Sequence, residues 1–153
     1  MSKIIFNLQI VCNKAYGLPD TADFHCWLQS ALFFSKRKIK INVRLVDVKE
    51  SRKLNMLYRK NNYPTNVLSF SYDGLPSPEI FLGDVIICRQ VVELEAIEQK
   101  KILKAHWAHM VIHGTLHLLG YNHVLKKEIL EMESLETTIM KKLGYCNPYI
   151  LNI

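Results

Sequence analysis

The sequence predicts an α+β domain in which about five helices cover one mixed sheet of four strands. Alternating apolar residues, typical of strands, fill segments in the first 88 residues, whereas helical periodicity prevails from residue 89 on. The 153 residues are 49% hydrophobic and 22% charged, which is ordinary for a globular domain with a sizeable core. Repeats, linkers and low-complexity stretches are absent from the sequence. We therefore expect residues 1–153 to form a single domain.

Strand and helix patterns alternate at the start of the chain. Residues 3–12 carry an apolar residue at every second position between Ile4 and Ile10, which predicts the first strand. A helix to about residue 34 follows, and Asp20 or Thr21 can cap it. Its apolar face is expected to comprise Phe24, Trp27, Leu28, Ala31 and Leu32.

Three further strands and one helix are predicted before residue 89. Residues 39–47 alternate cleanly and predict the second strand, and residues 66–71 and 80–88 predict the third and fourth. Residues 49–60 predict a helix that ends ahead of Pro64, because the residue before a proline disfavours the α region. Its buried side is expected to carry Leu54, Leu57 and Tyr58.

The remainder of the chain predicts three helices, over residues 89–98, 101–119 and 126–143. Gly144 predicts the end of the last one, and the tail from Tyr145 on is apolar enough to dock on the domain. The apolar stripe of that last helix comprises Ile129, Met132, Leu135, Ile139 and Leu143.

A metal-binding pattern lies at the end of the second of these helices, in the stretch HGTLHLLGYNH. His113 and His117 are four residues apart, so both rings project from one face of a helix and can bind one metal ion. Gly120 can adopt a positive φ, end the helix and bring His123 back as a third ligand. A lone histidine on an apolar helix is usually a core residue, but this spacing of three histidines and a glycine argues against chance. Three imidazoles and one open position are typical of a catalytic zinc ion, which lowers the pKa of bound water to near neutral.

The pattern lacks the general base of a protease. Its spacing is that of the metzincin motif HExxHxxGxxH, but Gly114 stands where those proteases carry a glutamate. Peptide hydrolysis by that route is therefore poorly supported. Asn122 can orient a ligand or a water, but a neutral amide cannot accept a proton near pH 7. Asp84, inside an apolar run, is interpreted first as a structural or ligand-orienting group.

Several other polar residues have two interpretations. His106 and His109 share a helical face with His113 and His117, which we call the metal pair. They could bind a second metal, but the favoured interpretation is that they are buried, hydrogen-bonded histidines. Arg59 at a helix end could clamp a phosphate bidentately, although most arginines serve only solubility. Thr65 and Asn66 fit an active site or, more commonly, a cap and turn.

Charge and cysteine usage favour a cytoplasmic enzyme with an anionic partner. The net charge of +6 and the pI of about 9.1 favour a partner such as nucleic acid. The four cysteines form no CxxC pair, which indicates reduced thiols in an intracellular protein. The first apolar run is broken too early for a signal peptide, and no stretch approaches the length of a membrane span.

With these residues in place, the sequence resembles the YbeY family of bacterial RNA-processing metalloproteins. The family signature HGxLHLxGYDH matches residues 113–123, with Asn122 in place of the usual aspartate. Residues 58–59 and 65–70 are similar to a second family block, and residues 82–85 to a third. The ordering and spacing of these blocks agree over most of the chain.

The resemblance implies a zincin-like fold, one zinc ion on His113, His117 and His123, and an RNA groove in which Arg59 matches an essential arginine. It implies a metal-dependent, single-strand-preferring endoribonuclease acting in 16S ribosomal RNA maturation and late ribosome quality control. The implied partners are the 16S rRNA precursor and the small ribosomal subunit, with ribosomal proteins or assembly GTPases as further candidates. If the family aspartate aligns a ligand or a water, Asn122 implies slower reaction or weaker metal binding. Two alternatives stay open: a non-enzymatic ribosome-assembly factor with a structural metal and, less favoured, a zincin-like metalloprotease.

Overall fold

The predicted α+β class is confirmed, with four strands and five helices in the part of the chain that the structure describes. The computed structural model describes residues 4–14, 16–33, 35–72, 79–121 and 124–150. Over these ranges, the elements in chain order are β1 (Ile4–Ile10), α1 (Thr21–Ala31), β2 (Lys38–Val46), α2 (Val48–Arg59), β3 (Val67–Ser71), β4 (Glu79–Cys88), α3 (Arg89–Glu98), α4 (Leu103–Leu118) and α5 (Lys126–Lys142).

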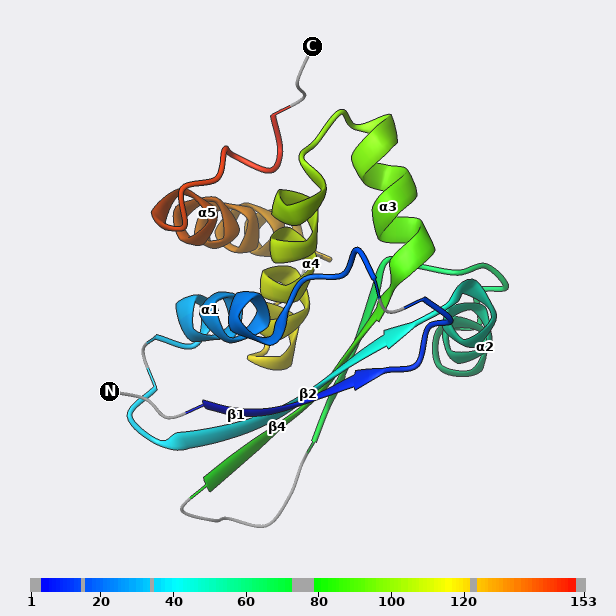
Figure 1. Cartoon of the computed structure of the whole chain (residues 1–153). Coiled ribbons are helices and arrows are strands. Elements are labelled where there is room, and N and C mark those ends of the chain that lie inside the picture. The colour runs from blue at the N-terminus through cyan, green and yellow to red at the C-terminus, as the bar shows by residue number, and fades with distance from the viewer. Residues whose placement is uncertain (1–3, 15, 34, 73–78, 122–123, 151–153) are drawn as a thin grey trace.

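The four strands form one mixed sheet in the order β1-β2-β4-β3 (Figure 1). β1 and β4 both run parallel to β2, whereas β3 pairs with β4 in the antiparallel sense. The alternation that predicted β2 is visible in its burial, because every second side chain is at most 1% exposed: Ile39, Ile41, Val43 and Leu45. These side chains point into the main core, beneath the helices.

A helical layer covers that face of the sheet, with α1, α4 and α5 stacked on one side of it (Figure 1). Asp20 caps α1 in a capping box with Asp23, and the whole predicted apolar face of this helix is buried. α4 is the central element, since it contacts α1, α3, α5 and the strands β3 and β4. Side chains that project from α4 are therefore held on several sides.

The opposite face of the sheet carries a smaller cluster, on which Leu54 of α2 packs. Here the prediction for α2 is partly wrong, because Leu57 and Tyr58 are 65% and 61% exposed. Ser51 and Asn55 are the buried residues of this helix instead. Their side chains bond to the loop that follows α2, so this helix uses a polar face to hold a loop.

The structural cause that ends α2 also differs from the predicted one, which was Pro64. The helix ends at Arg59, where expected, but Lys60 adopts the left-handed conformation with a φ of 60°. Its N–H bonds back to the carbonyl of Met56, which closes the last turn. The helix therefore ends five residues ahead of Pro64, through a left-handed cap rather than through the proline.

The described residues include all four cysteines of the chain. Cys12, Cys26, Cys88 and Cys146 are all free thiols, of which Cys12 and Cys88 are buried. In the part of the chain that the structure describes, none of the helices combines the length and the apolar character that crossing a membrane requires.

Candidate metal centre

His113 and His117 lie in the last turns of α4, and their rings converge on one point. Their Nε2 atoms are 3.0 Å apart, with the ring planes at 79° to each other. Two zinc-bound imidazole nitrogens at about 2.0–2.1 Å from the metal stand roughly 3.3 Å apart in tetrahedral geometry. Two ring nitrogens this close repel unless a proton or a cation lies between them. The pair therefore fits a metal ion bound through both Nε2 atoms.

Gly114 lets α4 approach the sheet closely enough to place this pair. A Cβ atom at this position would lie 2.8 Å from Val85 Cγ1 and 2.9 Å from Val67 Cγ2. The Ser69 hydroxyl donates to the Gly114 carbonyl at 2.8 Å and fixes the same contact. Residue 114 thus faces β3 and β4 rather than the metal pair, so a protease-like glutamate could not fit there without displacing the helix.

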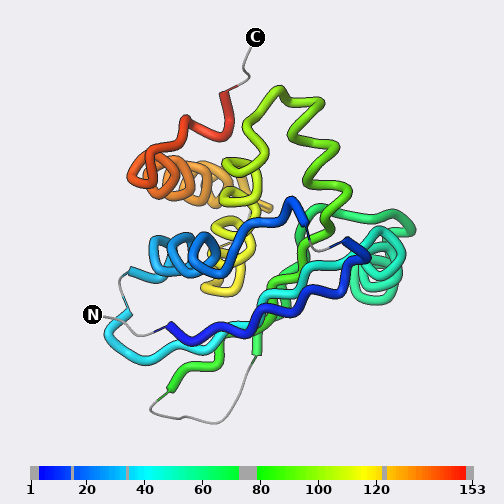
Figure 2. The backbone as a smooth tube through the Cα atoms, in the orientation of Figure 1, coloured from blue at the N-terminus to red at the C-terminus, as the bar shows by residue number. Residues whose placement is uncertain are grey.

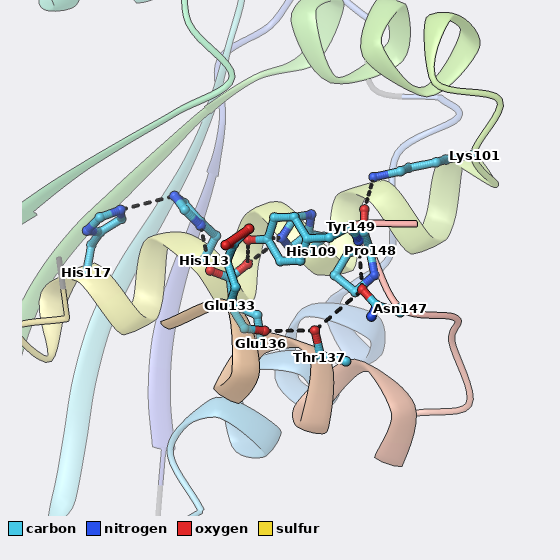
Figure 3. A network of polar contacts seen from close by, with 10 residues as sticks. All are labelled: Lys101, His109, His113, His117, Glu133, Glu136, Thr137, Asn147, Pro148 and Tyr149. Atoms are coloured by element: carbon cyan, nitrogen blue, oxygen red, sulfur yellow. Dashed lines mark hydrogen bonds and ion pairs between the residues drawn. The ribbon is translucent and has the colours of Figure 1, made fainter. Parts of the chain in front are cut away.

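Glu136 of α5 orients His113 from the other side of the ring (Figure 3). Its carboxylate is fully buried, and burial raises its pKa, but the hydrogen bonds from His109 and His113 outweigh this effect and lower the pKa to about 2. The ionised carboxylate only accepts, so the His113 Nδ1–H donates to Glu136 Oε1 at 3.0 Å. This tautomer leaves the Nε2 atom of His113 unprotonated toward His117, as a metal ligand requires.

A second arrangement of ligands includes Glu136, which the sequence did not single out. His109, His113 and Glu136 offer ligand atoms within 4.8 Å of one another and could hold a metal ion. The two arrangements use different nitrogens of His113, since Nδ1 faces Glu136 and Nε2 faces His117. The signal for Glu136 in the sequence is faint: a carboxylate four residues after Met132, within the apolar stripe of α5.

The expected turn after α4 is present. Gly120 has a φ of 99°, and the N–H of Tyr121 bonds back to the carbonyl of Leu116. The helix therefore ends at the glycine, where the metal pattern requires it to end. His123 and Asn122 lie outside the described residues, so the third ligand stays a prediction.

Arg59 and the metal pair line one cavity of about 320 Å³. Among the described residues, no carboxylate pairs with the exposed Arg59 guanidinium. The described residues that line this cavity include no acidic side chain. A cation and two imidazoles that line one cavity suit an anionic ligand such as a phosphate.

The loop beside Arg59 is pinned to α2 by the two buried polar side chains of that helix. The Ser51 hydroxyl accepts from the Thr65 N–H and donates to the Thr65 carbonyl, both at 3.0 Å. The Asn55 side chain donates to the Tyr63 carbonyl at 2.8 Å. The loop beside Arg59 is thereby held in place by Ser51 and Asn55, for which helical spacing is the only signal in the sequence.

Thr65 and Asn66 line the same cavity and also serve the turn. The Asn66 Oδ1 accepts from the Val67 N–H at 2.6 Å, and its Nδ2 donates to both Glu95 oxygens at 3.2 Å. The turn interpretation therefore holds for Asn66, which in addition ties β3 to α3.

The favoured interpretations of the two other histidines and of Asp84 are confirmed. His106 and His109 are 3% and 6% exposed, and they donate to Glu95 and Glu136 respectively. Asp84 accepts from the Asn42 side chain at 2.8 Å, on the neighbouring strand β2. His106 and Asp84 are therefore structural hydrogen-bonding groups, whereas the hydrogen-bonded His109 also belongs to the second ligand arrangement.

Comparison with known proteins agrees with this architecture. A solution structure of TM1509 from Thermotoga maritima is similar to this chain, with a TM-score of 0.58 and 23% sequence identity, covering 94% of this chain and 92% of that one. At that identity the likeness shows the shared fold. The family model described as Endoribonuclease YbeY matches residues 19–144, which include Arg59 and the whole metal pattern. The chain therefore belongs to the endoribonuclease YbeY family.

Proposed function

We propose that this protein is a metal-dependent endoribonuclease that prefers single strands and acts in the cytoplasm in 16S rRNA maturation and late ribosome quality control. The whole chain would form one hydrolase domain, and its metal would be one zinc ion on His113, His117 and His123. The observation that carries the proposal is the shared cavity, because Arg59 lines it together with His113 and His117. The family match supports RNA as the substrate.

Each residue of the site has its own role in the proposed reaction. A zinc ion, when bound, supplies a Lewis acid and a water that ionises near neutral pH. The planar guanidinium of Arg59 binds the scissile phosphate bidentately and stabilises the negative charge that grows on it. The hydrogen bond to Glu136 holds His113 in the ligand tautomer. Since no acidic side chain lines the cavity in the described part of the chain, we assign no side chain as general base.

The proposed partners follow from the substrate. The 16S rRNA precursor and the small ribosomal subunit would be the partners in the cell, together with ribosomal proteins or assembly GTPases. The net charge of +6 supports association with the phosphate backbone of RNA.

Cleavage of precursor 16S rRNA by zinc-loaded protein tests the proposal, with His113→Ala and Arg59→Ala purified in the same way. Removal of a group that stabilises transition-state charge costs on the order of 10²–10³ in rate, so we expect at least that loss for Arg59→Ala. Arg52→Ala is the matched control, because Arg52 is also an exposed arginine of α2 but lines a different cavity. Undiminished cleavage by both Arg59→Ala and His113→Ala would overturn the proposal. A duplex of the same sequence, cut more slowly, would bear out the strand preference.

The two alternative functions receive less support from this geometry. A non-enzymatic assembly factor would not need Arg59 on the wall of the metal cavity, where it lies. A metalloprotease would need a carboxylate beside the metal, and none lines the cavity among the described residues. Position 114 cannot supply it, because this position faces the sheet.

A further inference from the structure

Tyr149, in the segment after α5, is connected to the metal pair through one buried carboxylate. The Tyr149 hydroxyl donates to Glu136 Oε2 at 2.6 Å, and Glu136 Oε1 accepts from His113 Nδ1 at 3.0 Å. The opposite nitrogen of the same ring, His113 Nε2, faces His117 at 3.0 Å. Figure 3 shows these contacts as one line, from the C-terminal segment across α5 to the end of α4.

Glu136 depends on its donors, because a fully buried carboxylate without hydrogen bonds is strongly disfavoured. Three groups donate to it: the rings of His109 and His113 and the hydroxyl of Tyr149. The Tyr149 pKa is raised by burial and by the hydrogen bond to Glu136, so this hydroxyl stays protonated and keeps donating. His109 and Tyr149 share Oε2, which leaves Oε1 for His113.

Several contacts hold Tyr149 in this place. Its N–H donates to Asn147 Oδ1 at 2.8 Å, and its ring meets that of His109 edge-on at 5.3 Å. The carbonyl of the neighbouring Pro148 accepts from the ammonium group of Lys101, just ahead of α4. Figure 2 shows the segment after α5 turning back over that helix toward α4. The predicted docking of the apolar tail is thus confirmed for residues 145–150, and this docking brings a hydroxyl to the carboxylate that orients His113.

We propose that Tyr149 is a positioning residue for the metal centre: its hydroxyl fixes Glu136, Glu136 fixes the tautomer and angle of His113, and the C-terminal segment thereby sets metal affinity. The inference rests on the proposed use of His113 and His117 as metal ligands. Loss of a group that orients a ligand weakens metal binding by about 10–100-fold. We expect the upper part of that range for Glu136→Gln and about tenfold for Tyr149→Phe, because Glu136 keeps two donors in the latter.

The zinc dissociation constant, measured by competition with a chromogenic chelator, tests the proposal on the full chain. Tyr149→Phe removes one oxygen and keeps the ring against His109. Tyr145→Phe is the matched control: it removes the same atom from the same segment, and within the described residues the Tyr145 hydroxyl forms no hydrogen bond. We expect weaker zinc binding by Tyr149→Phe and unchanged binding by Tyr145→Phe. The ligand-field absorption of the cobalt-loaded protein, which reports ligand geometry, should change in Tyr149→Phe alone.

The outcomes separate this inference from the proposed function. Wild-type affinity and an unchanged cobalt spectrum in Tyr149→Phe would overturn the role of Tyr149 and leave the metal site intact. Equal losses in both tyrosine variants would also overturn it, because they would indicate a general effect of the segment. A wild-type chain that binds no zinc would overturn the proposed metal site together with this inference.

Discussion

At the scale of single residues, Gly114 is the position on which the placement of the metal pair depends most directly. In Gly114→Ala the new methyl group would meet Val85 and Val67 at 2.8 and 2.9 Å, where the buried strands leave no room. Alanine gains roughly 0.5–1 kcal/mol over glycine in a helix interior. Overpacking costs about 1–3 kcal/mol, so we expect net destabilisation. Urea unfolding measures it, with the exposed Ser134→Ala of α5 as control. A more stable Gly114→Ala would contradict this account of the helix–sheet contact.

Glu95 gives a residue-scale prediction about pH. Burial raises its pKa, but hydrogen bonds from His106 and Asn66 outweigh burial, and the net pKa is lowered. A carboxyl whose pKa is lower in the folded state contributes stability above its unfolded pKa of about 4.3, and this contribution is lost as the pH falls through the folded value.

Glu95→Gln should therefore be less stable at pH 7 and should lose less stability than the wild type on acidification. An amide offers one acceptor where His106 and Asn66 both donate, and an unsatisfied buried donor costs about 1–3 kcal/mol. Urea unfolding at pH 7 and at pH 3.5 measures both effects. Parallel pH profiles for the two proteins would show that Glu95 is not the titrating group.

At the scale of elements, α2 shows why a helical pattern does not reveal which face a helix buries. The apolar residues Leu57 and Tyr58 predict a core face, but α2 packs on the sheet through Leu54 and turns Ser51 and Asn55 inward. The reason is tertiary, because these polar groups bond to a loop 8–14 residues away in the chain. Such partners leave no periodic signal in the sequence.

Asn55→Ala tests the role of this polar face. The substitution removes the Asn55 amide that donates to the Tyr63 carbonyl. We expect the free energy of unfolding to fall by about 1–3 kcal/mol and the loop beside Arg59 to loosen. We expect RNA cleavage to fall while zinc affinity stays at the wild-type value, because the metal pair lies on α4. Lys53→Ala, at an exposed position of the same helix, serves as control. Reduced zinc affinity in Asn55→Ala would show that the two walls of the cavity are not independent.

At the scale of the whole molecule, local features were predictable and long-range partnerships were not. Four predicted features all lie within short stretches of sequence: the alternation of β2, the Asp20 cap of α1, the spacing of His113 and His117, and the turn at Gly120. Glu136 and Tyr149 follow His113 by 23 and 36 residues and come to it only through packing of α5 and the C-terminal segment. In the sequence, Glu136 and Tyr149 cannot be told from other glutamates and tyrosines. Only the fold brings them to His113.

Metal removal tests the centre as a property of the whole fold. A ligand that binds only the native state at 100 times its dissociation constant stabilises that state by about 2.7 kcal/mol. For a chain of this size, roughly 2–4 °C in Tm accompany each kcal/mol, so zinc should raise Tm by about 5–11 °C and a chelator should reverse the rise. His117→Ala should abolish the zinc-dependent shift, because it removes one of the two converging Nε2 atoms. The exposed His25→Ala should retain it. A full shift in His117→Ala that disappears in His109→Ala would instead place the ion among His109, His113 and Glu136.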